Sequence, residues 1–173
     1  MVSCSSAYGN AGCNGGWYYW AWDYMMVNNT EKGSSYPYTS GVTGVDGTCN
    51  ANTSIGTSHV SSYAAVGTTN ADIMAAINVG PVSVAVCAQF PAYQLYKSGV
   101  ISKNCGTLLD HANVAVGYGF DVASGLNYFL VRNSWGTSWG DNGYLKIEQS
   151  PTGDAPGICG INKAVYSVVA NSV

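Results

Sequence analysis

The second half of the chain is a series of short segments rich in Val, Ile, Tyr and Phe, separated from one another by Gly, Ser or Asp turns. Segments of this length and composition, bounded by turn residues, are typical of β-strands. They cover residues 82–86, 111–118, 127–133, 143–148 and 165–170. The pattern predicts an α+β fold whose main element is a long antiparallel, barrel-like sheet with flanking helices.

Helical signals lie further toward the N-terminus. Residues 17–32 should form one helix, with Asn14 as its N-cap and Gly33 as its stop, because apolar side chains recur at helical spacing at Trp17, Trp20, Tyr24 and Val27. Asn70-Ala71-Asp72 should cap a second, shorter helix that runs to residue 79 and ends at Gly80-Pro81. Its inner face would carry Ile73, Ala76 and Ile77. The turn-rich stretch 34–69 shows little periodicity and is expected to be an irregular connection.

Composition excludes several classes of function. The chain has 173 residues, of which 9% are charged, and a net charge of -3. The sequence has no basic patch of the kind that binds nucleic acids, and none of its apolar runs approaches the ~20 residues of a membrane span. The first residues lack the basic start and apolar stretch of a signal peptide. Without repeats or a low-complexity linker, residues 1–173 are expected to form a single domain.

Six cysteines in a weakly charged chain indicate an oxidising compartment, although their number alone does not select a pairing. Two Asn-x-Ser/Thr triplets, at Asn28 and Asn52, are candidate glycosylation acceptors. Together these features favour the secretory pathway, a lysosome-like compartment or the extracellular space.

Three motifs carry the candidate chemistry. The first is Gly12-Cys13-Asn14-Gly15-Gly16, the second is Leu109-Asp110-His111-Ala112 leading into Val116-Gly117-Tyr118-Gly119, and the third runs from Asn133-Ser134-Trp135-Gly136 to Trp139 and Gly140. In their order and spacing they resemble the papain family of cysteine peptidases, and the resemblance covers essentially the whole chain. A lone His before a strand is more often an ordinary core residue, so the combination carries the argument.

The resemblance implies site residues. His111 would be the general acid/base, Asn133 would orient its imidazole, and Trp135 and Trp139 would shield their contact from water. In the family, the nucleophilic cysteine and an oxyanion-hole glutamine precede the first motif, so we expect both on a segment that is cleaved away, absent from the structure or encoded elsewhere. Nothing around His59 resembles a site.

The resemblance also implies how substrate would bind. Gly15 and Gly16 would pair through their backbone with an extended peptide. A pocket for a bulky apolar side chain, two residues before the scissile bond, and its immediate surroundings would involve Trp17, Tyr18, Ala85, Leu109, Asp110 and Ala164. The simpler alternative is that Trp17 and Tyr18 only begin an amphipathic helix. No metal or cofactor is expected.

The cysteines follow the same alignment. Cys4 is expected to pair with Cys49, and Cys105 with Cys159. Cys13 would be an orphan thiol or would bridge to something outside the chain. Cys87 has no family counterpart and is most simply a free thiol.

These expectations define two functions of different classes. The first is a papain-like cysteine peptidase that hydrolyses peptide bonds, in which residues 1–50 are the remainder of a helical left-hand subdomain and residues 51–173 are the β-rich right-hand subdomain. A complementary segment or subunit would supply the nucleophile and the missing central helix, and the chain alone would be inactive. The rival is an inactive pseudoprotease acting as a binding or structural subunit. An inhibitor-like or lectin-like domain finds no motif in its favour.

Overall fold

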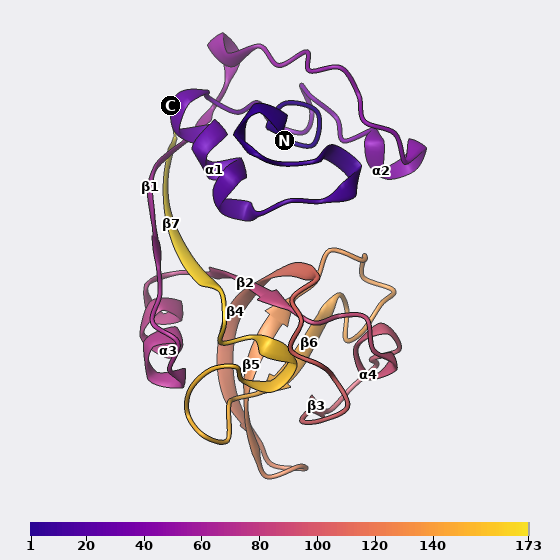
Figure 1. The fold of residues 1–173 in the computed structure, drawn as a ribbon, viewed down its shortest axis with the longest axis vertical. Coiled ribbons are helices and arrows are strands. Elements are labelled where there is room, and N and C mark those ends of the chain that lie inside the picture. Colours follow the sequence, from indigo (N-terminus) through magenta and orange to yellow (C-terminus); the bar gives the residue numbers. More distant parts are fainter. Residues whose placement is uncertain (173) are drawn as a thin grey trace. The chain divides into compact units, whose positions relative to one another are not determined.

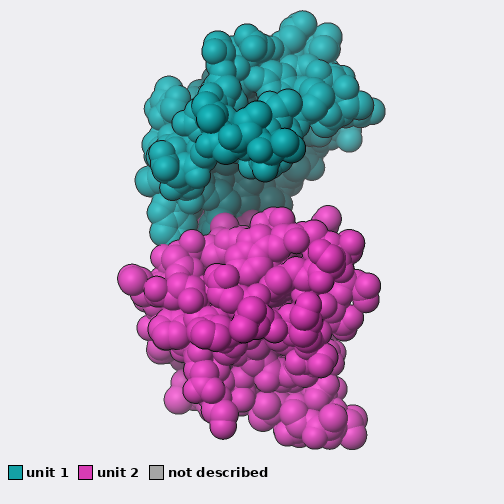
Figure 2. Space-filling model, turned by 90° about the vertical axis from the view of Figure 1, so that its right-hand side faces the viewer, with its two compact units in different colours: residues 1–63, 168–173 teal, residues 64–167 magenta. Residues whose placement is uncertain are grey.

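The computed structural model describes residues 1–172 and divides the chain into two compact units (Figures 1 and 2). Unit 1 contains residues 1–63 and the C-terminal residues from Val168, and unit 2 contains residues 64–167. The chain therefore passes from unit 1 into unit 2 at Tyr63 and returns after Ser167. The subdomain bounds expected from the sequence, with a division after residue 50, stay a prediction.

One sheet supplies most of the regular structure. Within residues 1–172 it has seven strands in the order β1-β7-β2-β4-β5-β6-β3. The strands are β1 (Ser58–Ala65), β2 (Val82–Val86), β3 (Val100–Ile101), β4 (His111–Asp121), β5 (Leu126–Arg132), β6 (Tyr144–Glu148) and β7 (Val165–Ser172). β2, β4, β5 and β6 pair antiparallel in succession, and β2 also pairs antiparallel with β7. The expected α+β architecture is confirmed, with one addition: the short edge strand β3 pairs parallel with β6, so the sheet is mixed.

The core of unit 2 lies on the inner face of this sheet. Alternate residues of β5 and β6 are fully buried, as the period of two along a strand requires: Phe129 and Val131, and Leu145 and Ile147. Helix α3 (Asn70–Val79) packs on β2 and β4 and buries Ile73 completely (Figure 1).

The bounds of α3 match the expected helix, but its N-cap is Thr69 and not the Asn70-Ala71-Asp72 segment. The hydroxyl oxygen of Thr69 accepts from the Asp72 backbone N–H, and the Asp72 carboxylate accepts from the Thr69 backbone N–H. This reciprocal capping box satisfies two of the backbone donors that a helix start leaves free. Four-residue helix α4 (Pro91–Gln94) begins with Pro91 in its first turn and carries the buried Tyr93.

Unit 1 contains α1 (Tyr18–Val27), the short α2 (Ser40–Thr43) and three 3-10 turns, η1 (Ser6–Tyr8), η2 (Gly12–Asn14) and η3 (Thr53–Ile55); the fourth 3-10 turn, η4 (Ile158–Gly160), belongs to unit 2. Helix α1 begins one residue later and ends five residues earlier than the expected 17–32. The N-cap of α1 is Trp17, which has an extended backbone conformation. Asn14 lies in η2, so the prediction of Asn14 as the N-cap is wrong. Its end has a physical cause: the Asn28 side chain donates to the Tyr24 carbonyl, and Thr30 then bridges to Ser58 as a strand would.

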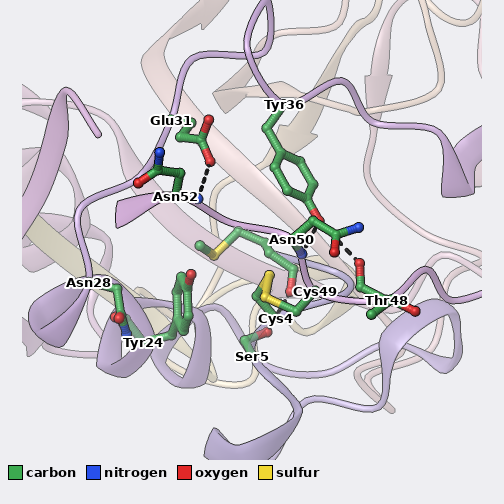
Figure 3. The surroundings of a disulfide bond; sticks show 11 residues. Cys4, Ser5, Tyr24, Asn28, Glu31, Tyr36, Thr48, Cys49, Asn50 and Asn52 are labelled. Carbon is green, nitrogen blue, oxygen red and sulfur yellow. Dashed lines mark hydrogen bonds between the residues drawn. A yellow bond between two sulfur atoms is a disulfide. The ribbon is translucent and has the colours of Figure 1, made fainter. Parts of the chain in front are cut away.

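Both disulfides expected from the resemblance are present, Cys4–Cys49 in unit 1 and Cys105–Cys159 in unit 2. Around Cys4–Cys49, the connecting loop is fixed by polar contacts (Figure 3). The Asn52 backbone N–H donates to a Glu31 carboxylate oxygen at 2.7 Å, and the Tyr36 hydroxyl lies between Thr48 and Asn50. These bonds order a segment that has little apolar surface to bury.

Candidate active site

Two neighbouring strands of unit 2 bring the expected His and Asn together. His111 is the first residue of β4, and Asn133 directly follows the last residue of β5. Because β4 and β5 run antiparallel, the start of one lies beside the end of the other. The Asn133 backbone N–H donates to the Gly143 carbonyl at 2.9 Å, which holds the residue in place after its strand has ended. His111 Nε2 and Asn133 Oδ1 are 2.8 Å apart.

The proton of this contact can be assigned from a second hydrogen bond. The backbone N–H of Ser134 points at the same Asn133 atom, at 2.7 Å. A backbone N–H is always a donor, so the atom it meets must be the amide oxygen. His111 Nε2 must then carry a proton to donate, because an oxygen with two neighbours of this kind can only accept. In the neutral ring, Nδ1 is therefore the nitrogen with a free lone pair.

The indole rings of Trp135 and Trp139 form an aromatic wall beside the imidazole. The rings of His111 and Trp135 are 5.0 Å apart, and Trp135 meets Trp139 edge to face at 5.2 Å. Trp139 is fixed by its indole N–H, which donates to the Gln94 carbonyl at 2.9 Å. Trp135 is 37% exposed, whereas Asn133 is 7% exposed. The shielding role expected of Trp135 and Trp139 stays a prediction.

Four of the expected substrate residues lie in unit 2. The Ala85 backbone N–H donates to the Ala164 carbonyl at 3.1 Å, and a Cβ added to Gly160 would meet the Leu109 side chain at 2.9 Å. Asp110 is exposed but occupied, because its carboxylate accepts the Ala88 backbone N–H at 2.7 Å. The structure thus groups Ala85 with Ala164 by a hydrogen bond and gives Asp110 a structural task.

The other four lie in unit 1. Gly15 has a φ of +96°, a conformation that a side chain would strain, and no heavy atom lies within 4 Å of where its Cβ would be. A Cβ on Gly16 would collide with the Asn10 side-chain oxygen, which accepts the backbone N–H of Trp17 at 2.9 Å. Exposed backbone at this point therefore depends on both glycines and on Asn10. Tyr18, half-buried, is the first residue of α1.

Neither free cysteine has the surroundings of a nucleophile. Cys13 is exposed, and its hydrogen bond with the Asp46 carboxylate raises the pKa of the thiol, which disfavours the reactive thiolate. Cys87 is fully buried, and its backbone N–H donates to the Cys159 carbonyl. Among residues 1–172, no three His, Cys, Asp or Glu side chains lie close enough to hold a metal ion, and no helix is long and apolar enough to cross a bilayer.

Sequence reasoning missed three side chains that support these groups. Asn10 precedes the glycine motif without belonging to it, and Tyr93 lies in a helix of one turn that has no periodic signal. Asn113 lies in a strand pattern where an apolar residue is the usual occupant. The position of Asn113, two residues after His111, was the one available signal, because side chains at that spacing share a face of a strand.

Known proteins are similar to this chain in both sequence and fold. The sequence model of the papain family cysteine proteases matches residues 1–169. The chain is 41% identical over 168 residues to cysteine proteinase COT44 of Brassica napus, covering 93% of this chain and 48% of that protein. It is 44% identical over 155 residues to digestive cysteine proteinase 3 of Homarus americanus, covering 87% and 46% of the two chains.

Solved structures agree. The inhibitor-bound bromelain protease of Ananas comosus superposes with a TM-score of 0.84 at 34% identity, over 97% of this chain and 74% of that one. Digestive procathepsin L 3 of Tenebrio molitor gives 0.85 at 31% identity, over 97% and 53%. The chain spans between about a third and a half of the length of the first relatives it matches (48%, 34% and 42%). Sequence motifs, fold and the neighbouring His and Asn lead to one conclusion, that this chain belongs to the papain family of cysteine proteases.

Proposed function

We propose that this chain supplies the His and Asn of the catalytic triad of a papain-like cysteine peptidase, and that the nucleophilic cysteine lies outside these 173 residues. The observation that carries the proposal is the geometry at Asn133 Oδ1, which accepts from both His111 Nε2 and the Ser134 backbone N–H. That geometry leaves the imidazole with one defined nitrogen, Nδ1, to exchange a proton with a reacting group.

The chemistry follows from this tautomer. A thiol beside Nδ1 would transfer its proton to the ring, and the thiolate would attack the peptide carbonyl. The C–N bond then breaks as Nδ1 returns the proton to the leaving amine, which forms a thioester. Water attacks the thioester while Nδ1 takes a proton from it, and the thiol recovers that proton as it leaves. Nε2 keeps its own proton throughout and donates it in the hydrogen bond to Asn133 Oδ1.

An amide suits this orienting role better than a carboxylate. The thiolate and the imidazolium already balance each other's charge, and a buried negative charge beside the ring would perturb both pKa values. Asn133 offers the same acceptor atom without that charge. The buried amide nitrogen of Asn133 has no hydrogen-bond partner among residues 1–172, which is consistent with an amide oriented by its oxygen alone.

The substrate would be a peptide with a bulky apolar side chain two residues before the scissile bond. Ala85, Leu109 and Ala164 offer apolar side chains, and the Asp110 carboxylate is held by a backbone N–H. Gly15 and Gly16 offer bare backbone that can pair with an extended peptide. Trp17 and Tyr18, which follow these glycines in unit 1, would add aromatic surface to that backbone pairing.

Two further parts of the proposal concern the whole protein. A complementary segment would carry the thiol at a helix N-terminus, where the helix dipole and the imidazole together lower its pKa. It would also cover the half-buried Trp17 and Trp20, so the chain by itself should be poorly stable and inactive. Two disulfides and the sequons favour maturation in the secretory pathway, with action in a lysosome-like or extracellular space.

The test combines sequencing of the region upstream of Met1 with an assay of peptide hydrolysis. The region encoded upstream of Met1 is read and searched for a Gln-x-x-x-Cys segment. The chain is then assayed alone and co-expressed with that region, on a peptide with an apolar residue two before the cut, with and without a thiol-alkylating reagent. Turnover that needs the added region and is abolished by alkylation, or by His111→Ala, supports the proposal.

Two other outcomes are distinct. Alkylation-sensitive turnover by the chain alone would refute the proposal and make Cys87 a candidate nucleophile. No turnover even with the added region would favour the inactive pseudoprotease, which binds peptides or partners without cutting them. Retention of both His111 and Asn133 in contact is the observation that argues against that alternative, because binding alone requires neither.

A further inference from the structure

Behind the aromatic wall lies a buried polar pair that the proposed chemistry does not use. The Asn113 side-chain amide donates to the Tyr93 hydroxyl oxygen. Tyr93 is 0% exposed and Asn113 is 5% exposed. Burial raises the pKa of Tyr93, which favours the neutral hydroxyl.

A buried polar pair of this kind contributes less to the stability of a core than apolar side chains would. The Asn113 side-chain oxygen has no hydrogen-bond partner among residues 1–172, so the amide is only partly satisfied. A buried polar group without a full set of partners destabilises a fold, and two apolar side chains of similar shape would fill the space at lower cost. The neighbours of Asn113 along β4 are apolar, as in an ordinary strand: Ala112, Val114 and Ala115. The pair therefore calls for a role other than stability.

Tyr93 contacts the three rings at the His–Asn contact, His111, Trp135 and Trp139. Its ring centroid is 5.5 Å from Trp135 and 5.5 Å from Trp139, and it meets the His111 ring edge to face at 6.0 Å. Helix α4, which carries Tyr93, is joined to Trp139 by the indole bond to Gln94. Among residues 1–172 the imidazole has one polar contact, with Asn133, so packing alone restrains the other side of the ring.

Asn113 connects this ring to the strand that carries the imidazole. It lies two residues after His111 in β4, on the same face of the strand. Its position is fixed by the sheet, because it pairs with Val84 of β2. A hydrogen bond from a sheet residue to the Tyr93 hydroxyl ties the tip of that ring to the backbone from which His111 projects. A phenylalanine at position 93 would keep the packing but lose this tie.

We propose that Tyr93 and Asn113 are positioning residues: their hydrogen bond fixes the Tyr93 ring, which in turn holds His111 against Trp135 in the orientation that reaches Asn133. The inference rests on the proposed function, since it gives the imidazole a reason to be held. Neither residue touches the reacting atoms. Both act through His111.

The test is a double-mutant cycle with Tyr93→Phe, Asn113→Val and the combined variant, measured on the full chain. Global stability is followed by the urea midpoint, and the site by NMR, as the chemical shifts of the His111 ring protons at one pH and their cross-relaxation with Trp135. His59, in unit 1, is the internal reference. Tyr118→Phe is the matched control, because its hydroxyl is also hydrogen-bonded to an asparagine, here as the donor to Asn78 on the exposed surface.

Each single variant should lower the urea midpoint and shift the His111 ring signals with loss of the Trp135 cross-peaks. The combined variant, which removes both polar groups, should regain the midpoint but not the His111 signals. Tyr118→Phe should leave the His111 signals unchanged. In a peptidase completed with its nucleophile, the combined variant should lower kcat by up to about 100-fold with a smaller change in KM, as expected for a misplaced catalytic group.

The NMR result decides the inference without catalysis, so it stands apart from the success of the proposed function. Recovery of both the midpoint and the His111 signals in the combined variant would show that the pair is an ordinary core contact and would overturn the inference. Single variants that leave the His111 signals in place would overturn it as well, even if the chain proves to be an active peptidase component.

Discussion

Removing the Cys105–Cys159 disulfide should cost unit 2 about 4 kcal/mol of its free energy of unfolding. The bridge spans a sequence separation of 54. For a loop of that length, cross-linking removes about 14 cal/mol/K from the entropy of the unfolded chain, which gives the figure of about 4 kcal/mol at 25 °C. Since a domain is stable by only about 5–15 kcal/mol, the double replacement Cys105→Ala/Cys159→Ala should leave unit 2 marginal.

The other disulfide provides a matched control. Cys4–Cys49 spans a sequence separation of 45, and because the entropy depends on the logarithm of loop length, its predicted contribution is again about 4 kcal/mol. The surroundings separate the two. Cys159 is 1% exposed within the core of unit 2, so truncation also leaves a cavity that costs roughly 1 kcal/mol. Cys49 is exposed and leaves none.

The assay is urea unfolding under non-oxidising, non-reducing conditions, read by hydrogen exchange of separate peptides from β4–β5 and from α1. With a typical dependence of about 2 kcal/mol per molar urea, the loss of about 4 kcal/mol and the further cavity cost of about 1 kcal/mol should lower the β4–β5 midpoint by about 2.5 M in the Cys105→Ala/Cys159→Ala variant. The Cys4→Ala/Cys49→Ala variant should instead weaken α1. A β4–β5 midpoint within about 0.5 M of the wild type would refute the reasoning, because the entropic loss alone exceeds that.

Three further outcomes are expected. The Lys146 ammonium lies 2.8 Å from the Asp121 carboxylate and holds the Asp121 pKa at about 2. This ion pair therefore stabilises the fold above pH 3.8 and loses its effect as the pH falls toward 2. Lys146→Met should flatten that part of an acid-unfolding curve, and an unchanged curve would contradict the assignment. In a secretory host, Asn52→Gln should remove a glycan detectable by mass, whereas Asn28→Gln should leave the mass of the glycans unchanged. The reason is that Asn52 is exposed, while the Asn28 amide caps α1 at the Tyr24 carbonyl (Figure 3). A glycan found at Asn28 would contradict this prediction. In a completed peptidase, Asn133→Ala should lower kcat/KM by about 100-fold with little loss of folded protein, since the imidazole can then adopt the other tautomer; full activity would exclude an orienting role.

The parts of the fold with strong local signals could be predicted from the sequence. The bounds of α3 follow from its apolar face and from Gly80, although its cap lies one residue before the expected segment. β2 and β7 begin at the expected residues because their Val-rich stretches follow Pro81 and Ala164 closely. Adjacent His and Asn side chains followed from motif context, not from periodicity.

Other parts depend on contacts that no local pattern reveals. β1 was expected to be part of an irregular connection, because it reads Ser-His-Val-Ser-Ser-Tyr-Ala-Ala and buries only Val60 fully. α1 ends early because Thr30 finds a partner in Ser58, which is 28 residues away. Tyr93 and Asn113 meet across a separation of 20 residues. Long-range pairing of this kind can override local propensity, and a single sequence gives little warning of it.

The discontinuity of unit 1 bears on how the chain can be made. Its first 63 residues emerge from the ribosome early, but β1 is completed by the C-terminal stretch, where the Ser61 hydroxyl donates to the Val169 carbonyl at 3.2 Å. At a translation rate of about 5–20 residues per second, that partner arrives on the order of ten seconds later. Unit 2 is contiguous and can close its core in the meantime. Synthesis of unit 1 therefore begins before that of unit 2, but unit 1 is completed after it. During this interval a chaperone could bind the aromatic helix α1.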